Sequence, residues 1–287
     1  DVCGEDHEPA FLETLAAVAS RSPEKAAKFA SAFGGDPVVG YERLIERPDV
    51  DAVYVPLPPS LHEEWVIRAV KAGKHAFVEK PFAVSADSGR RMVDAAAAAG
   101  RLLMENFAFL RHPRMAFVDS AIARGDIGEL RVLRAAFAFP GLSPDNIRLD
   151  RNLGGGALLD CGVYAAQACL RFLGPGLKVL AVRLRTDPAK GVDVAGEVML
   201  ESRSGAMAQL AFGFEHYYQC EIVLWGSSGR LVLERAFTPL PDQEAVVWLE
   251  RRNARQEHRF PAENQYERIF RHFAATAVSG KGFKEEH

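Results

Sequence analysis

The stretch from Asp51 to Phe82 decides the fold. It begins Asp51-Ala-Val-Tyr-Val-Pro-Leu-Pro-Pro-Ser-Leu-His62, continues as an amphipathic helical run and ends Lys74-His-Ala-Phe-Val-Glu-Lys-Pro-Phe82. Two short apolar runs of β type flank one helical run, which predicts a β-α-β crossover with both strands buried. In a doubly wound sheet, ligands bind at the carboxyl ends of the strands. Lys80 is therefore expected where a cofactor and a substrate meet.

Strand-like and helical runs alternate on both sides of this stretch. Ser22-Pro23-Glu24 predicts a helix start, because a capping serine precedes a proline at the first helical position, and Gly34 ends that helix. A further helix is predicted between Ser85 and Gly100, followed by a strand at 102–105. This alternation predicts a Rossmann-type, doubly wound parallel α/β sheet over residues 1–108.

The pattern changes after Pro113. A helix is predicted to about Arg124, a strand over 130–139, and an apolar helix that follows the triple glycine 154–156 and runs through Leu173. Apolar runs separated by turns follow, and a closing helix is predicted over 264–279. The runs are 192–200, 207–214, 221–225, 231–233 and 245–249. Residues 109–287 are therefore predicted to form an α+β domain with a mostly antiparallel sheet.

Composition excludes several classes of protein. The 287 residues allow two domains, and the 48% hydrophobic and 25% charged content is ordinary for a soluble globular protein. A net charge of −3 gives no basic field for nucleic acid, and no apolar run approaches the about 18 residues of a membrane span. The scattered cysteines 3, 161, 169 and 220 predict neither disulfides nor a metal site, and fit a reducing cytoplasm.

A dinucleotide domain should open with a strand and a G-x-G-x-x-G turn, whereas this sequence opens Asp1-Val-Cys3. We expect that the first strand and most of the turn precede the sequence given; the alternative is a degenerate domain. About 20 residues past that turn an acid normally holds the ribose 2′-hydroxyl. Ser20-Arg21 occupies this place, and a hydroxyl with a guanidinium favours a 2′-phosphate, hence NADP over NAD. The alternative is an ordinary surface arginine before a helix cap.

Tyr164 is a candidate acid or base. It lies in Leu159-Asp-Cys-Gly-Val-Tyr164, after the triple glycine, and glycine permits close approach of backbone to a ligand. Asp160 is four residues earlier and shares its helix face. A lysine nearby would favour ionisation of the phenol and fit it for acid or base chemistry. Alone, Tyr164 would more often be a core residue, and Lys80 a lysine snorkelling at a strand end.

Taken in order, these motifs resemble the glucose-fructose oxidoreductase / inositol dehydrogenase / rhizopine-catabolism (Gfo/Idh/MocA) family over nearly the whole chain. They are Ser20-Arg21, Val55-Pro-Leu-Pro58 with His62, Glu79-Lys-Pro81, Asn146-Ile-Arg148 and the glycine-rich segment that ends at Tyr164. Glu105-Asn-Phe107 and Tyr217-Tyr218 are most similar to the nucleotide-sugar 3-ketoreductase branch. The family's chains also continue beyond His287, so the resemblance implies an incomplete chain at both ends.

The resemblance implies residue roles. Ser20 and Arg21 would hold the 2′-phosphate of NADP(H), Tyr41 would lie near the adenine, and the cofactor's middle would be near Leu57 and His62, with Glu79 and Lys80 at the nicotinamide end. Lys80 and Tyr164 would be catalytic, and the substrate would be held by Arg148, Asp160 and Asn106. No metal is implied. The C-terminal domain, residues 109–287, would bind substrate, and a homodimer or homotetramer would form through its open sheet.

The expected function is NADPH-dependent reduction of a keto group on a nucleotide-linked deoxysugar. One alternative is a dehydrogenase of a free sugar or dihydrodiol in the same family. The other is a non-catalytic regulator that senses NADP or sugar, against which the presence of both Lys80 and Tyr164 argues.

Overall fold

A computed structural model describes residues 15–283, so the predicted remnant of the glycine-rich turn at Asp1–Cys3 lies outside the described residues. The chain divides into two compact units. The first contains the described residues up to Asn106 together with the end of the chain from Ile269, and the second is Phe107–Arg268. The sequence had placed the end of the chain in the second domain; the structure groups it with the first.

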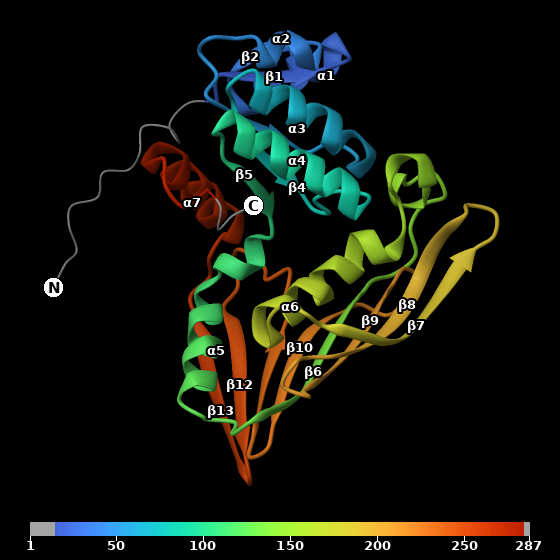
Figure 1. Ribbon diagram of the computed structural model, residues 1–287, viewed down its shortest axis with the longest axis vertical. Helices are drawn as coiled ribbons and strands as arrows, with labels where there is room; N and C mark the ends of the chain where they lie inside the picture. Colours follow the sequence, from blue (N-terminus) through green and yellow to red (C-terminus); the bar gives the residue numbers. More distant parts are fainter. Residues whose placement is uncertain (1–14, 284–287) are drawn as a thin grey trace, which may run out of the picture. The chain divides into compact units, whose positions relative to one another are not determined.

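The first unit is built from parallel strands and helices (Figure 1). Strands β1 (Ala17–Ser20) and β2 (Asp36–Val39) form one parallel pair, and β3 (Ala52–Val55), β4 (His75–Glu79) and β5 (Leu103–Asn106) form a second parallel sheet in that order. The helices are α1 (Pro23–Phe33), α2 (Tyr41–Ile45), α3 (His62–Lys71) and α4 (Ala86–Ala99), with a short 3-10 helix at Pro59–Leu61. The predicted β-α-β crossover over Asp51–Phe82 is confirmed.

The core of this unit explains the apolar strand runs. Val53 and Val55 of β3 and Ala76 and Val78 of β4 are all buried in one cluster with helices α3 and α4. The opposite side of β4 carries Phe77, whose ring packs against two phenylalanines of helix α7 (Gln265–Ser279), Phe270 at 4.8 Å and Phe273 at 5.0 Å. These aromatic contacts are why the end of the chain belongs to the first unit.

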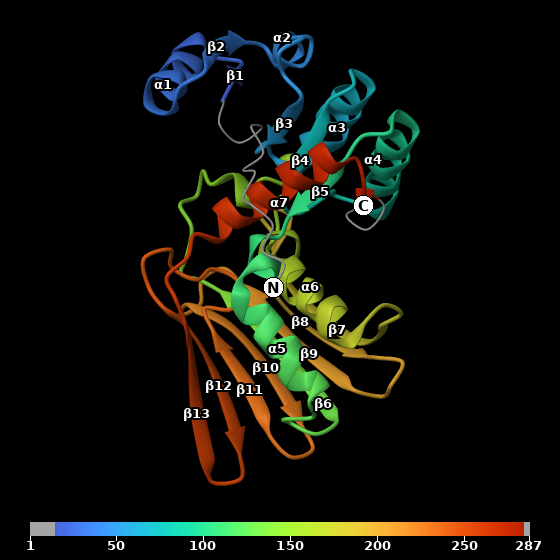
Figure 2. The ribbon, with the colours of Figure 1, turned by 90° about the vertical axis from the view of Figure 1, so that its left-hand side faces the viewer.

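The second unit carries an eight-stranded sheet (Figure 2). Its strand order is β13-β12-β11-β10-β6-β9-β8-β7, and only the β6–β9 pair is parallel. The strands are β6 (Leu130–Ala138), β7 (Lys178–Asp187), β8 (Val192–Glu201), β9 (Met207–Gly213), β10 (Gln219–Gly226), β11 (Arg230–Glu234), β12 (Ala245–Arg251) and β13 (Ala254–Phe260). The predicted open, mostly antiparallel sheet is confirmed.

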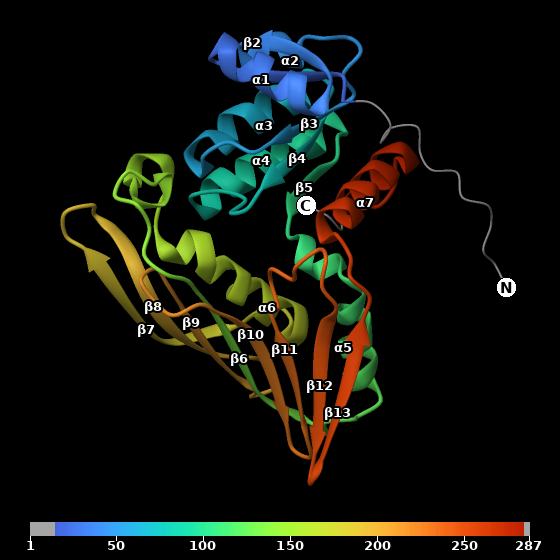
Figure 3. The same cartoon turned by 180° about the vertical axis from the view of Figure 1, so that it is seen from behind.

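Helices cover one face of this sheet (Figure 3). Helices α5 (Pro113–Ala123) and α6 (Val163–Leu173) pack with the inward-facing residues of the sheet in one large core. Short 3-10 helices lie at Ala108–Arg111, Ile147–Leu149 and Arg151–Leu153, and a π-helical turn at Leu158–Gly162 leads into α6. Within Phe107–Arg268, no described helix covers the other face, which presents the partly exposed Trp225 and Met199.

The helical run from Arg151 to Leu173 is long and apolar enough to cross a membrane by length and composition alone. However, 44% of its most apolar window is buried within the structure. Ala165, Ala168 and Cys169 of this run are fully buried in the core of the second unit. The buried residues of this run are therefore part of the core of the second unit.

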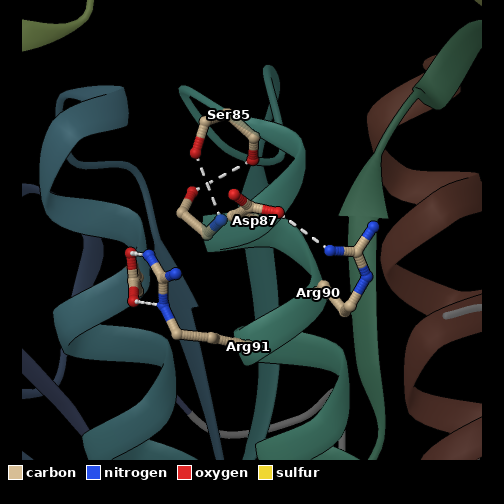
Figure 4. A network of polar contacts seen from close by, with 6 residues as sticks. Ser85, Asp87, Arg90 and Arg91 are labelled. Atoms are coloured by element: carbon tan, nitrogen blue, oxygen red, sulfur yellow. Dashed lines mark hydrogen bonds and ion pairs between the residues drawn. The ribbon is translucent and has the colours of Figure 1, made fainter.

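Helix ends follow the predicted capping signals. Ser22 Oγ accepts a hydrogen bond from the Lys25 amide at 3.2 Å and begins α1, which ends at Gly34. Ser85 caps α4 in the same way through the Ser88 amide, and Arg91 of α4 forms a bidentate ion pair with Glu63 of α3 (Figure 4). These contacts set the ends of the helices that frame the carboxyl ends of β1 and β4.

Candidate active site

The carboxyl end of β1 presents the predicted phosphate-binding pair. Ser20 ends the strand, its Oγ accepts a hydrogen bond from the Ser22 amide at 3.2 Å, and its carbonyl accepts from the Gly40 amide at 3.0 Å. Arg21 is exposed. Both residues stand just before the amino end of α1, where the helix dipole is positive. A hydroxyl, a guanidinium and a helix amino terminus form a donor set that fits the 2′-phosphate of NADP.

Tyr41 lies at the start of α2, next along the chain from β2. Its half-buried ring packs edge-on against Trp65 of α3, with ring centroids 4.9 Å apart, and Arg68 stacks over the same indole at 4.8 Å. These contacts hold an aromatic ring at the carboxyl end of β2, a suitable place for an adenine to stack.

His62 is completely buried and ties two loops together. Its Nε2 lies 2.8 Å from the Leu57 carbonyl oxygen, and its Nδ1 lies 3.0 Å from that of Pro81 and 3.3 Å from that of Phe82. Burial lowers the pKa of His62, and the three carbonyl contacts oppose this effect. The imidazole thus links the loop after β3 to the turn after β4 instead of facing solvent.

Glu79 organises the polar cluster at the end of β4. Its Oε1 accepts hydrogen bonds from the Tyr54 hydroxyl and from Asn106 Nδ2, the latter at 2.6 Å, while its Oε2 accepts from the Lys80 amide at 3.3 Å. The Glu79 carboxylate therefore fixes the backbone from which the Lys80 side chain departs. The Lys80–Pro81 peptide bond is cis.

Asn106 was predicted to contact substrate, but its amide nitrogen is engaged by Glu79. The side chain is only 3% exposed, and among residues 15–283 its Oδ1 has no hydrogen-bond partner. The structure thus gives Asn106 a role in holding Glu79.

Glu105 was not predicted as a site residue. It lies next to Asn106 at the end of β5, and its Oε1 accepts a hydrogen bond from the Phe82 amide at 2.7 Å. Burial raises the pKa of the Glu105 carboxyl to about 8, with the Phe82 hydrogen bond acting against this shift. The available signal was an acid directly after the buried run of residues 102–104.

In the second unit, Tyr164 lies within a cage of four phenylalanines. Its ring centroid is 5.1–6.0 Å from theirs, and the residue is 9% exposed. The four are Phe107, Phe109, Phe137 and Phe237. The cage fixes the orientation of the Tyr164 ring and leaves only a small part of the residue exposed. Sequence reasoning missed it because three separate chain segments contribute the phenylalanines.

Arg148 and Asp160 are brought together as an ion pair. Arg148 Nε lies 2.9 Å from Asp160 Oδ2, with side-chain exposures of 42% and 14%. Asp160 belongs to the π-helical turn before α6, a deviation from α-helix that often marks functional sites. The half-exposed guanidinium can still reach a ligand.

The glycines before this turn are expected to allow close approach of a ligand. In the structure, other parts of the chain lie close to Gly155 and Gly156. A Cβ on Gly155 would lie 2.5 Å from the Arg148 carbonyl oxygen. Gly156 has φ +124°, and a Cβ there would lie 2.4 Å from Asp193 Oδ1. Asp193 Oδ2 in turn accepts a hydrogen bond from the Leu158 amide at 2.6 Å. Glycine is needed here so that the Arg148 loop can close on the helix that carries Asp160 and Tyr164.

Comparison with known proteins agrees with this arrangement. Residues 4–107 match the model described as oxidoreductase family, NAD-binding Rossmann fold, and residues 115–232 match the GFO/IDH/MocA C-terminal domain. A dTDP-3,4-didehydro-2,6-dideoxy-alpha-D-glucose 3-reductase of Saccharopolyspora spinosa is 45% identical over 268 residues, or 93% of this chain and 81% of the relative. A D-xylose 1-dehydrogenase (NADP(+)) of Haloferax volcanii is 33% identical, covering 93% of this chain and 82% of its own.

Among solved structures, a 3-ketoreductase from Actinomadura kijaniata in complex with NADP and TDP-benzene has a TM-score of 0.92 and 43% identity, covering 95% of this chain and 84% of that one. Variants of that enzyme with a tyrosine replaced by phenylalanine and a lysine by alanine match with TM-scores of 0.92 and 0.88, at 41% and 42% identity. They cover 97% and 95% of this chain, and 87% and 83% of their own. Motif order, fold and these matches lead to one conclusion: the chain belongs to the Gfo/Idh/MocA oxidoreductase family.

Proposed function

We propose that the protein is an NADPH-dependent 3-ketoreductase that reduces the keto group of a nucleotide-linked deoxysugar. The observation that carries this proposal is the 45% identity to a dTDP-deoxysugar 3-reductase over 93% of the chain. The relative that acts on a free sugar, D-xylose, is 33% identical. This difference favours the nucleotide-linked substrate over the free-sugar or dihydrodiol alternative.

NADP(H) is the cofactor, and the donor set at the end of β1 supports this assignment. We assign Ser20 and Arg21 to the 2′-phosphate and Tyr41 to the adenine. Bound NADPH supplies the hydride. Leu57 lies on the loop that His62 anchors, so His62 shapes the cofactor site through the backbone.

Lys80 and Tyr164 are the proposed catalytic residues. The lysine and tyrosine replaced in the solved variants lie as far apart in that chain as Lys80 and Tyr164 do in this one. As the carbonyl carbon is reduced, the π electron pair moves to the oxygen. The Lys80 ammonium stabilises the developing negative charge, and the Tyr164 hydroxyl transfers its proton to that oxygen. Glu79 orients Lys80 by holding its backbone amide.

Arg148 and Asp160 are the proposed substrate-binding residues. The half-exposed guanidinium of Arg148 suits an anionic or hydroxylated ligand, and Asp160 holds that guanidinium in place. Asn106 is also a proposed substrate-binding residue, because its Nδ2 donates to Glu79 while its Oδ1 has no hydrogen-bond partner among residues 15–283.

The nucleotide is the part of the substrate that distinguishes the alternatives. Tyr217 is 94% exposed and available to stack on a base, whereas the Tyr218 hydroxyl contacts Thr238 at 2.8 Å and its ring packs under Arg235. Calorimetric titration with TDP, TDP-glucose and free glucose tests the substrate class. We expect saturable binding of the two nucleotides and none of free glucose. Binding of the free sugar alone would contradict the proposal.

A homodimer or homotetramer through the sheet is part of the same proposal. The face of the sheet away from α5 and α6 carries Trp225, 46% exposed with Arg134 stacked over it at 5.1 Å, and the pair of Arg255 over Trp248 at 3.8 Å. Such partly exposed aromatic and arginine residues are typical of interfaces. Light scattering that gives the mass of a single chain at micromolar concentration would contradict it.

Cytoplasmic localisation is proposed from the cysteines. Cys161, Cys169 and Cys220 are all buried free thiols, whereas Cys3 lies outside the described residues. Free thiols are the rule in a reducing compartment. A disulfide in protein isolated from its native cell would count against this localisation.

A regulator that senses NADP or sugar without turnover is the second candidate. Lys80 and Tyr164 would then have no chemical task. Binding of NADPH by a preparation that reduces no TDP-linked 3-ketosugar would support it.

A further inference from the structure

The turn that carries Lys80 is held by side chains on both of its sides. On one side His62 Nδ1 lies within hydrogen-bonding distance of the Pro81 and Phe82 carbonyl oxygens. On the other side Glu105 Oε1 accepts the Phe82 amide at 2.7 Å. His62 comes from α3 and Glu105 from β5, so side chains from two different elements of the same unit fix the turn.

Glu105 is also linked to Lys80 through charge. Besides burial, which has the largest effect, the pKa of Glu105 is raised by the Glu79 carboxylate and lowered by the Lys80 ammonium. Its pKa of about 8 means that the carboxyl group is mostly protonated at neutral pH. A group that titrates near the working pH, beside a proposed catalytic cation, is more often functional than a surface acid.

We propose that Glu105 is the positioning residue for Lys80 in the ketone reduction proposed above, on which this inference rests. Its carboxyl group fixes the Phe82 amide, and its protonation state sets how much of the Lys80 charge is available to the substrate oxygen. The geometry assigns the first role through the 2.7 Å hydrogen bond. The same hydrogen bond supports the second role, because it holds the Glu105 carboxyl at the amide of Phe82, two residues along the chain from Lys80.

The direction of the effect follows from electrostatics. When Glu105 is protonated, Glu79 is the acidic neighbour on β4 that opposes the Lys80 charge. When Glu105 ionises, a second carboxylate attracts the same ammonium and offsets part of its field at the substrate. His62 faces the turn from α3, and burial lowers its pKa while the three carbonyl contacts oppose this effect. Reduction should therefore weaken as pH rises through the Glu105 pKa.

Two substitutions separate the two roles. Glu105→Gln keeps an oxygen that accepts the Phe82 amide but cannot ionise, and Glu105→Leu removes the acceptor at similar volume. We expect kcat of E105Q to stay within about twofold of wild type below neutral pH, and to lack the wild-type decline near pH 8. We expect E105L to lose about tenfold or more in kcat, with NADPH affinity nearly unchanged, since Lys80 acts in the transition state.

The controls distinguish this inference from the proposed function. If Lys80→Ala retains wild-type turnover, the proposed chemistry itself fails. If Lys80→Ala is inactive while E105Q keeps the wild-type alkaline decline, or E105L keeps wild-type kcat, then only the role of Glu105 is refuted. If E105L fails to fold, the pH profile of E105Q still tests the role of Glu105.

Discussion

His112 is a buried base at the start of α5. It is 2% exposed, and its Nδ1 accepts the Arg114 amide at 3.3 Å. Burial lowers the pKa of His112 to about 4, helped by the positive charges of Arg114 and Arg268. Arg114 is itself fully buried and donates hydrogen bonds to three backbone carbonyls at 234–236. These carbonyls directly precede Phe237, one of the four phenylalanines around Tyr164. Protonation of His112 would place a second cation in this cluster.

This arrangement predicts a loss of stability in acid. The folded pKa of His112 lies below the unfolded value of 6.5, so its contribution is complete above pH 6.5 and is lost as pH falls towards about 4. His112→Asn keeps a helix-capping side chain that cannot be protonated. Between these pH values, wild type should lose up to about 3 kcal/mol more than H112N. Thermal unfolding at several pH values checks this, and parallel curves for both proteins would refute it.

For single residues, the sequence names candidate site residues but does not indicate which side chains surround them. Lys80 is predicted as a site residue because it follows a buried strand, and Arg148 because of the family resemblance. Glu105 and the phenylalanine cage were not found, because their importance depends on contacts between distant segments. His62 was predicted to lie near the cofactor, yet nothing in the sequence indicates that three carbonyl oxygens surround its ring.

At the scale of elements, local signals succeeded where they were strong. The capping serines at positions 22 and 85 and the glycines at 34 and 100 mark the observed helix ends. Strand β13 was missed because its sequence, Ala254-Arg-Gln-Glu-His-Arg-Phe260, is polar on both faces, as suits a charged edge strand. The π-helical turn at Leu158–Gly162 was missed because it depends on how the Arg148 loop closes, which is not a local property.

The contribution of the Ser85 cap to the stability of α4 can be tested by substitution. Ser85→Ala removes the oxygen that accepts the Ser88 amide and should cost about 1 kcal/mol of unfolding free energy. Ser120→Ala, within α5, is the matched control; it removes a hydroxyl bonded to the Ala116 carbonyl and should be nearly neutral. Urea unfolding of both variants measures the difference. Equal midpoints would show that the Ser85 cap does not stabilise the helix.

At the scale of the whole molecule, the fold class and family followed from the order of motifs along the chain, and both are confirmed. The division into units differs from the prediction at the end of the chain. Phe270 and Phe273 pack on Phe77 of β4, and the sequence contains no signal that pairs these rings. A change of pattern between consecutive elements indicates a domain boundary in the sequence. The sequence does not indicate that a helix at the end of the chain packs on the first unit.

We propose that Lys80 and Tyr164 together catalyse the reduction of the ketone of a TDP-linked sugar by NADPH. The most direct measurement is kcat for NADPH oxidation with a TDP-linked 3-ketosugar by wild type, Lys80→Ala and Tyr164→Phe, with NADPH affinity measured in parallel. We predict that Lys80→Ala lowers kcat by about 100-fold or more and that Tyr164→Phe lowers it by at least about tenfold, while both still bind NADPH. Wild-type kcat in both variants would contradict the account.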